Sequence, residues 1–148
     1  GPPGTGKTEL ARVAAGDVPC LPLYRHHEET PDGTALRDFT HGVDIAQGHL
    51  AALAYLVGHP GRHVFNLGRG LPVSVMDTLK AFETASGQPV HWTPCLQDPT
   101  EVTCSAANAL RAKNQLGWQA ALDQADMCRD HWRWQSRNPQ GYEGGGAA

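Results

Sequence analysis

Apolar residues recur at a helical spacing in one long stretch of the first half of the chain. A turn over residues 30–34 leads into a short extended run that presents Arg37 and His41. From about Val43 or Asp44 the apolar positions follow the period of a helix that packs one face on a core. The predicted buried stripe consists of Ile45, Ala46, Leu50, Leu53, Ala54, Leu56 and Val57.

The same patterning, together with end signals, predicts further helices and short strands. Ser74 and Asn108 are expected to cap helices at their N-termini, and Gly87 and Gly117 to end them. The predicted helices cover residues 8–15, 74–87, 108–117 and 122–135. The predicted strands cover residues 20–24, 63–67 and 90–93. Strands that alternate with helices predict an α/β protein.

Composition excludes several classes of protein. The chain has 148 residues, enough for one domain with a core, and a net charge of -3. The lack of a basic surface argues against nucleic acid and anionic membranes as partners. No apolar run approaches the roughly 20 residues that span a bilayer, and no signal peptide is visible. The four cysteines show no CxxC spacing, which favours reduced thiols in a cytoplasmic protein.

The first eight residues, GPPGTGKT, satisfy the P-loop pattern and resemble the Walker A motif of AAA+ ATPases. In such a loop the backbone around Gly4 and Gly6 wraps the phosphates, Lys7 reaches the outer phosphates and Thr8 holds Mg²⁺. Two parts of a working P-loop are missing around it: a buried strand leading into the loop, and a downstream hydrophobic strand ending in an acidic metal ligand. A loop that starts the first helix is the favoured interpretation, and ATP binding is the alternative.

No metal site is predicted. The run from His26 to Glu29 alternates in direction on an extended chain, so its side chains cannot converge on one ion. His59 and His63 are four residues apart, but Pro60 and Gly61 prevent a helix from placing them on one face.

Four segments carry a resemblance to a known family. RDFTHGVDIAQGHLAAL, from Arg37, is similar to the RDY-x-HV-x-D-x-A-x-GH segment of extended short-chain dehydrogenases/reductases, in particular the UDP-glucose 4-epimerases. HVFNLGRG, SVMDTLKAFETASGQPV and DHWRWQSRNPQGYEG follow in the family's order. The resemblance covers most of residues 12–144 and only the C-terminal part of the family. It implies the last strands and helices of a Rossmann fold plus a small substrate lobe.

The family binds NAD on an N-terminal Rossmann domain and uses a Tyr-x-x-x-Lys pair, with the tyrosine as base. The resemblance therefore implies NAD as cofactor, but this chain has no such pair and no dinucleotide fingerprint, so no catalytic residue and no cofactor are expected in this chain alone. Its tyrosines and the residues four positions on are Tyr24 and Glu28, Tyr55 and His59, and Tyr142 and Gly146.

What the resemblance leaves in this chain is the substrate-binding part. Arg37 matches the family arginine that pairs with the diphosphate of a UDP-sugar, a contact that suits a guanidinium. We group Asp38 and Asn66 with it as candidate substrate-binding residues, although Asn66 also suits a tie between the strand end and a neighbouring loop. The alternative for Arg37 is an internal salt bridge with Asp38 or Asp44. His41 is expected to be a packed core residue.

One departure from the family lowers the expected affinity. The family carries a second diphosphate-binding arginine in a Pro-Arg-Arg-x-Gly-Asp loop, whereas this chain reads PCLQDPTEV and has no arginine between Arg69 and Arg111. Asp98 and Glu101 add negative charge there. Losing one charge-assisted contact costs on the order of 2–3 kcal/mol, so UDP-sugar binding is expected to be weak or lost.

These observations give three hypotheses: an epimerase-like substrate part that is inactive alone, a P-loop nucleotide binder, and a non-catalytic scaffold. The expected organisation is a P-loop-like segment with the first helix (1–16), an epimerase-like substrate domain (17–143) and a disordered tail (144–148). A sheet without its N-terminal strands exposes an open edge and an apolar face. We therefore expect poor solubility or association, as a homodimer or with a missing N-terminal half.

Overall fold

The structure, a computed structural model, describes residues 7–24, 29–95 and 102–139. The predicted tail and most of the His-His-Glu-Glu run lie outside the described residues. The described elements are α1 (Lys7–Ala14), β1 (Leu21–Tyr24), β2 (Leu36–Arg37), α2 (Gly42–Gly58), β3 (Val73–Ser74), α3 (Val75–Ser86), β4 (Trp92–Cys95), β5 (Cys104–Ser105), α4 (Leu110–Leu116) and α5 (Gln124–Arg137).

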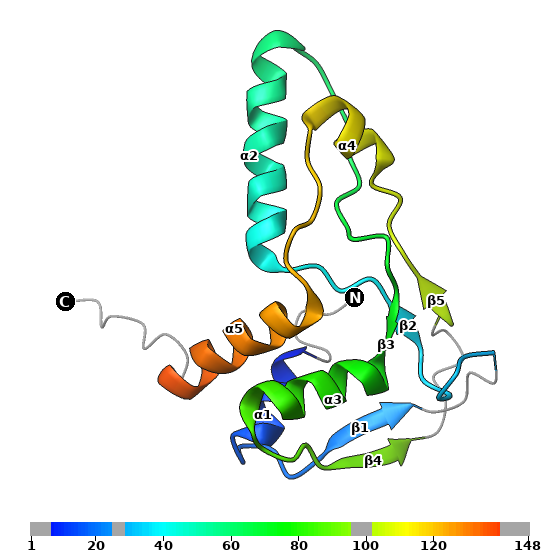
Figure 1. The fold of residues 1–148 in the computed structure, drawn as a ribbon, viewed down its shortest axis with the longest axis vertical. Coiled ribbons are helices and arrows are strands. Elements are labelled where there is room, and N and C mark those ends of the chain that lie inside the picture. The colour runs from blue at the N-terminus through cyan, green and yellow to red at the C-terminus, as the bar shows by residue number, and fades with distance from the viewer. Residues whose placement is uncertain (1–6, 25–28, 96–101, 140–148) are drawn as a thin grey trace.

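The strands form two small sheets, and in Figure 1 the pair β1 and β4 lies below the sheet of β2, β3 and β5. β1 pairs with β4 in parallel, with Leu21 opposite Trp92. In the second sheet the order is β3-β2-β5, where β2 is antiparallel to β3 and parallel to β5. The parallel pairs joined through helices confirm the predicted α/β class.

The main core lies where α1, α3 and α5 pack together beside β1 and β4. Phe82 of α3 is at its centre, with its ring edge-on to His131 and Trp132 of α5 at 5.9 and 6.1 Å between centroids. Trp132 thus holds α5 to the body. The buried members of this core are Leu10, Ala11, Val13, Leu21, Leu79, Phe82, Val90 and Cys128.

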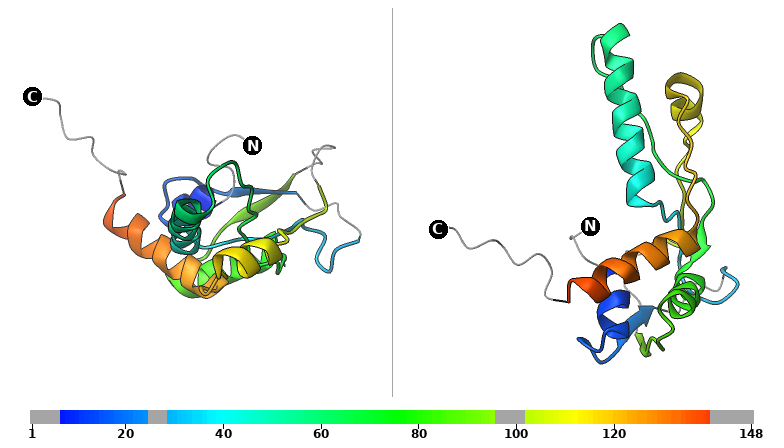
Figure 2. Two further views of the ribbon diagram at one scale, coloured as in Figure 1. Left: turned by 90° about the horizontal axis from the view of Figure 1, so that it is seen from above. Right: turned by 60° about the vertical axis from the view of Figure 1, so that its left-hand side comes forward.

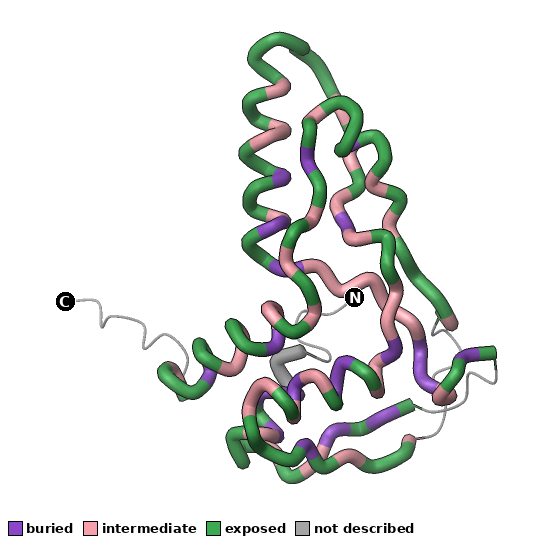
Figure 3. The backbone as a smooth tube through the Cα atoms, in the orientation of Figure 1, coloured by how far each residue is buried: buried purple, intermediate pink, exposed green. Residues whose placement is uncertain are grey.

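α2 and α4 extend together away from this core, and Figure 2 shows the same arrangement from a second direction. α2 begins and ends close to the predicted positions, but the prediction that its apolar stripe is buried is wrong for this structure (Figure 3). Leu50, Leu53 and Val57 are 66%, 62% and 89% exposed, and only Asp44 and Gly48 are buried within the helix. The pattern defined the helix correctly, but no described segment covers its outer face.

The predicted strand at residues 63–67 is extended but belongs to neither sheet. A strand requires a neighbour for its backbone hydrogen bonds, and the described residues provide none. Two other elements begin two residues later than predicted. β4 begins at Trp92 instead of Val90, and α5 begins at Gln124 instead of residue 122. Asp123 and Asp126 form a capping box that fixes the start of α5.

The helix ends predicted from Ser74, Gly87 and Gly117 are confirmed. The Asp77 N–H donates to Ser74 Oγ at 2.9 Å, and both glycines adopt positive φ at the ends of α3 and α4. The prediction that Asn108 is the N-cap of its helix is wrong by one position, because the N-cap residue of α4 is Ala109. The Asn108 side chain still binds the helix start, since its Oδ1 accepts the Leu110 N–H at 3.0 Å.

A buried hydroxyl network holds the N-terminus of α3. The Met76 N–H donates to Thr34 Oγ1 at 3.2 Å, beside the Ser74 cap, and the Thr34 hydroxyl donates to Asp32 Oδ1 at 2.6 Å. Burial disfavours the charged form of Asp32, but hydrogen bonds from Ser74 and Thr34 outweigh burial and hold the pKa of Asp32 below its ordinary value. Asp32 therefore orients both hydroxyls toward the helix.

We expect Asp32→Ala to lower the free energy of unfolding by about 1–2 kcal/mol at pH 7, because two buried hydroxyls lose their acceptor. A depressed carboxyl pKa contributes stability above the unfolded pKa, and this contribution is lost as the pH falls through the folded pKa. The difference between wild type and variant, measured by urea unfolding, should therefore shrink below about pH 4. Asp32→Asn keeps an acceptor and should lose less; an equal loss in both variants at every pH would contradict the network.

Candidate functional site

The candidate site was predicted at Arg37 and Asp38, at the end of β2. We call the rim the place where this strand end meets the loop at residues 68–70 and the segment after β5. The Asp38 carboxylate accepts three backbone hydrogen bonds: Oδ1 from the Arg69 N–H at 3.1 Å, and Oδ2 from the Gly70 and Ala107 N–H groups at 2.9 and 3.0 Å. One side chain thereby joins β2 to the loop at residues 68–70 and to the segment after β5. Asp38 therefore holds the segments of the rim together, because its carboxylate is bound by their backbone N–H groups.

The approach of these segments depends on Gly68, which is buried. A Cβ at this position would lie 2.5 Å from Asp38 Oδ2 and 2.4 Å from the Ala107 Cβ. Both distances are shorter than real contacts allow, so a side chain here would push the carboxylate away from its backbone donors. Gly68 therefore allows the close approach of these segments, and no sequence motif indicated this position.

Arg37 lies in β2 next to Asp38 and is half-buried. Its Nη1 donates to the carbonyl oxygen of Leu36 at 2.9 Å and to that of Val102 at 2.6 Å. These bonds fix the guanidinium at the side of the sheet where β2 meets the segment leading into β5. The carboxylates proposed as alternative salt-bridge partners, Asp38 and Asp44, are each held by backbone N–H groups.

Asp44 is the second carboxylate that joins distant segments. It is 1% exposed, and its oxygens accept the N–H groups of Ala121 and Leu122 at 3.2 and 3.0 Å. The Trp118 indole donates to the Asp44 carbonyl oxygen at 2.9 Å. Together these bonds anchor the first turn of α2, directly after the rim, to the segment that leads into α5.

His41 is a buried N-cap rather than a surface residue. Its Nδ1 accepts the Val43 N–H at 3.0 Å, and its Nε2 lies 3.4 Å from Asp130 Oδ2 on α5. The Nδ1 acceptor role requires the Nε2–H tautomer, which then faces the carboxylate. This confirms the expectation of a packed, hydrogen-bonded histidine.

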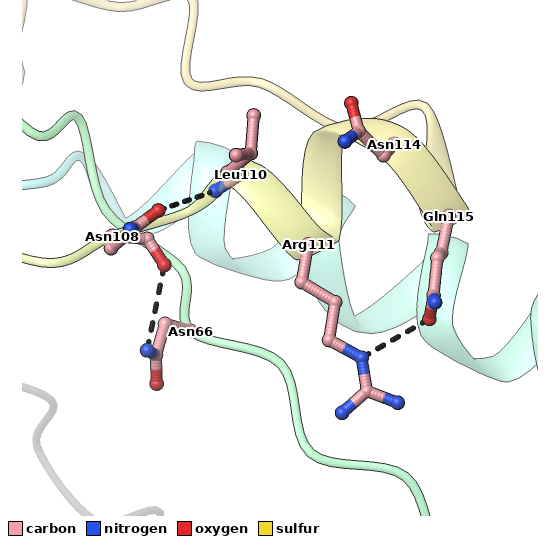
Figure 4. Close-up of a pocket in the computed structure, with 6 residues that line it drawn as sticks. All are labelled: Asn66, Asn108, Leu110, Arg111, Asn114 and Gln115. Atoms are coloured by element: carbon pink, nitrogen blue, oxygen red, sulfur yellow. Dashed lines mark hydrogen bonds between the residues drawn. The ribbon is translucent and has the colours of Figure 1, made fainter.

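Asn66 lies in a different place from Arg37. It lines a shallow cavity of about 510 Å³ with Asn108, Leu110, Arg111, Asn114 and Gln115 (Figure 4). Its Nδ2 donates to the Asn108 carbonyl oxygen at 3.4 Å, the loop contact expected as its second interpretation. The described lining of this cavity does not include Arg37 or Asp38, so the structure does not gather the three candidates around one cavity.

The positively charged side chain in this cavity, Arg111, is bound by other groups of the protein. Arg111 Nε donates to Gln115 Oε1 and its Nη1 to the Val64 carbonyl oxygen, both at 3.1 Å. Its guanidinium carbon lies 5.0 Å from the centroid of the Phe65 ring. Arg111 therefore holds α4 to the extended segment and is not presented to a ligand.

The candidate phosphate-binding residues Gly4, Gly6, Lys7 and Thr8 stay a prediction from the sequence. Gly4 and Gly6 lie outside the described residues, and Lys7 and Thr8 are described only as backbone at the start of α1. In the part of the chain that is described, no group of three metal-ligating side chains converges and none of the four cysteines is in a disulfide. Among those residues no helix has the length and apolar character to cross a bilayer.

Comparison with solved structures places the chain in a fold class. It superimposes with a TM-score of 0.88 and 35% identity on UDP-glucose-4-epimerase from Stenotrophomonas maltophila with bound NAD and formylated UDP-arabinopyranose, covering 95% of this chain and 42% of that one. For UDP-glucose 4-epimerase from Bifidobacterium longum in complex with NAD⁺ and UDP the TM-score is 0.84. The fold is therefore α/β and matches the C-terminal portion of extended short-chain dehydrogenases/reductases.

Sequence comparison narrows the class. Over 144 residues the chain is 42% identical to UDP-glucose 4-epimerase of Drosophila melanogaster. The matched region covers 96% of this chain and 41% of that protein. The chain spans about two-fifths of the length of the curated relatives it matches. No family model matches it. The chain is thus similar to the C-terminal part of UDP-glucose 4-epimerases, and the comparisons do not favour the ATPase alternative.

Proposed function

We propose that this chain is the substrate-binding part of a UDP-glucose 4-epimerase, the enzyme class that interconverts UDP-glucose and UDP-galactose. The observation that carries the proposal is the 42% identity over 96% of the chain, together with a fold that superimposes along nearly its whole length on epimerase structures. The cytoplasmic location expected from the cysteine pattern belongs to the same proposal, and none of the four thiols is in a disulfide.

In this proposal Arg37 pairs with the diphosphate of the UDP-sugar. A guanidinium presents donors in a planar fork that matches phosphate oxygens, and its charge strengthens each bond. The bonds from Nη1 to the Leu36 and Val102 carbonyl oxygens orient the group before the ligand arrives. Less side-chain freedom is then lost on binding, which lowers the entropic cost.

Asp38 and Gly68 act as positioning residues for this contact. The carboxylate fixes the loop at residues 68–70 and the start of the segment after β5 relative to β2, so the strand that carries Arg37 has a defined rim. Asn66 acts away from Arg37, because its side chain ties the extended segment to the Asn108 carbonyl oxygen.

Hydride transfer is assigned to the part of the relatives that this chain does not span. NAD accepts the hydride from the sugar in this enzyme class, but the residues of this chain do not fit the cofactor. Its sequence has neither the glycine fingerprint after a strand nor a Tyr-x-x-x-Lys pair. The chain alone is therefore expected to bind without turning over.

The experiment is saturation-transfer NMR with UDP-glucose on the full chain, a method suited to weak binding. Because the second family arginine is absent, we expect a Kd near the millimolar range, about 4 kcal/mol of binding free energy. Arg37→Ala should weaken binding about tenfold or more, since a charge-assisted contact is lost. Arg133→Ala, an exposed arginine on α5, is the matched control and should have no effect.

Two results would argue against the proposal. The first is UDP-glucose binding that Arg37→Ala and Arg133→Ala affect equally. The second is stabilisation by ATP with Mg²⁺ that Lys7→Ala abolishes, which would support the nucleotide-phosphate alternative.

A further inference from the structure

The loop at residues 68–70 brings a second arginine to the rim. Its middle residue, Arg69, donates its backbone N–H to Asp38 Oδ1 at 3.1 Å, and Asp38 follows Arg37 directly in the chain. This series of bonds limits the distance between the Cα atoms of the two arginines to about 12 Å at most. The carboxylate that holds the rim together therefore also keeps two cationic residues close to each other.

A glycine on each side fixes the backbone of Arg69. Gly68 is buried, and a Cβ there would lie 2.5 Å from Asp38 Oδ2. Gly70 has a φ of 70°, and its N–H donates to the same oxygen at 2.9 Å. These contacts involve only backbone atoms of the loop, so the place of Arg69 in the rim does not depend on its own side chain.

The guanidinium of Arg69 is not bound by the described part of the protein. Arg69 is half-buried, yet among the described residues its side chain makes no hydrogen bond, ion pair or ring contact. The side chain of Arg37, also half-buried, donates to two carbonyl oxygens. Burying part of a charge without a partner costs free energy, so the position of Arg69 favours an anionic ligand. The other arginines without such a bond in the described ranges are exposed: Arg62, Arg133 and Arg137.

The charges around Arg69 favour a ligand over a carboxylate of the rim as its partner. Asp38 already accepts three backbone hydrogen bonds and forms no ion pair with Arg69 in the described structure. Two cations on neighbouring segments repel each other, and salt screens charges fully only beyond a Debye length of roughly 8–10 Å. A ligand with negative charge on two adjacent groups relieves this repulsion when it binds both cations.

A diphosphate has room for a second arginine beside Arg37. One planar guanidinium binds one phosphoryl group through two parallel bonds. The Nη1 group of Arg37 is already shared with the carbonyl oxygens of Leu36 and Val102. The second arginine of the family belongs to a loop where this chain reads PCLQDPTEV, without a cation. Arg69 provides a second cation from a different loop of the same rim.

We propose that Arg69 binds the diphosphate of the UDP-sugar together with Arg37, in place of the arginine that the family carries elsewhere. The inference rests on the proposed function and deepens it, because it adds a binding residue to the same site. The millimolar affinity expected for the chain is then shared by two cations. The glycines on both sides hold the backbone of Arg69 in place before the ligand arrives, which lowers the entropic cost of binding.

The test is an NMR titration of the full chain with UDP, and with uridine as the ligand that lacks phosphate. Arg69→Ala should weaken UDP binding about tenfold or more and leave uridine binding unchanged, because a charge-assisted contact to the diphosphate is lost. Arg69→Lys keeps the charge without the planar fork and should lose less. Arg62→Ala removes the same charge at an exposed position and is the matched control, with no effect expected.

Thermal unfolding separates a lost contact from a lost fold. The Arg69 side chain makes no bond among the described residues and its backbone N–H remains in the variant, so Arg69→Ala should unfold at the same temperature as wild type. UDP binding that Arg69→Ala weakens no more than Arg62→Ala does would overturn the inference. A loss of uridine binding as large as the loss of UDP binding would overturn it as well, because the effect would not come from the diphosphate.

The same titrations distinguish this inference from the proposed function. If Arg37→Ala weakens UDP and Arg69→Ala does not, only the inference on Arg69 is overturned. If Arg69→Ala weakens UDP and Arg37→Ala does not, the role proposed for Arg37 is wrong, while the contact of Arg69 with the diphosphate is supported. If neither variant changes UDP binding, both are overturned.

Discussion

Asp44→Ala is expected to lower the free energy of unfolding by about 2–4 kcal/mol, because two backbone N–H groups lose their acceptor. Asp44 is almost fully buried and holds Ala121 and Leu122, so its removal detaches the first turn of α2 from the segment before α5. Urea unfolding followed by tryptophan fluorescence measures the loss. Trp118, bonded to the Asp44 carbonyl oxygen, reports the local change.

Asp77→Ala is the matched control for this experiment. Asp77 also lies in the first turn of a helix, but its side chain is exposed, and among the described residues its one ion-pair partner is Lys80 at 3.8 Å. An exposed pair of this kind contributes at most about 1 kcal/mol. If Asp44→Ala costs no more than Asp77→Ala, the role assigned to the buried carboxylate is wrong.

Gly68→Ala is expected to cost about 1–3 kcal/mol, the usual range for overpacking a close contact. The new methyl group would occupy space held by Asp38 Oδ2 and the Ala107 Cβ, so the carboxylate must leave its three backbone donors. The same variant should speed hydrogen exchange at Arg69, Gly70 and Ala107. Thermal unfolding and exchange mass spectrometry measure the two effects.

Gly58→Ala provides the comparison, because nothing lies within 4 Å of a Cβ at that position at the end of α2. It should be neutral or slightly stabilising, as alanine favours helix over glycine. Equal stability of the two variants, or a Gly68→Ala chain that keeps slow exchange at Arg69 and Gly70, would show that the rim does not depend on this glycine.

Local signals predicted the helices well. Ser74, Gly87 and Gly117 act within a few residues of the ends they define, so a single sequence contains the information. The N-cap role of His41 follows the same logic, although the sequence predicted only that this side chain would be packed. The resemblance to epimerase segments added the order of the elements.

Contacts between distant residues were not predictable. Asp38 bonds to residues 31, 32 and 69 positions away, and Arg37 to a carbonyl 65 positions away, so no local pattern reveals them. The two-residue strands β3 and β5 have too few positions to show alternation. The apolar stripe of α2 was read as buried because periodicity reports the need for a cover, not its presence.

The most direct test of the central claim compares two ligands on two proteins. UDP and uridine share the base and ribose and differ in the diphosphate that Arg37 is proposed to bind. The dissociation constants of both ligands are measured by NMR titration on wild type and on Arg37→Ala. The account predicts that the substitution weakens UDP about tenfold or more and leaves uridine unchanged. An equal effect on the two ligands, or none on UDP, would contradict it.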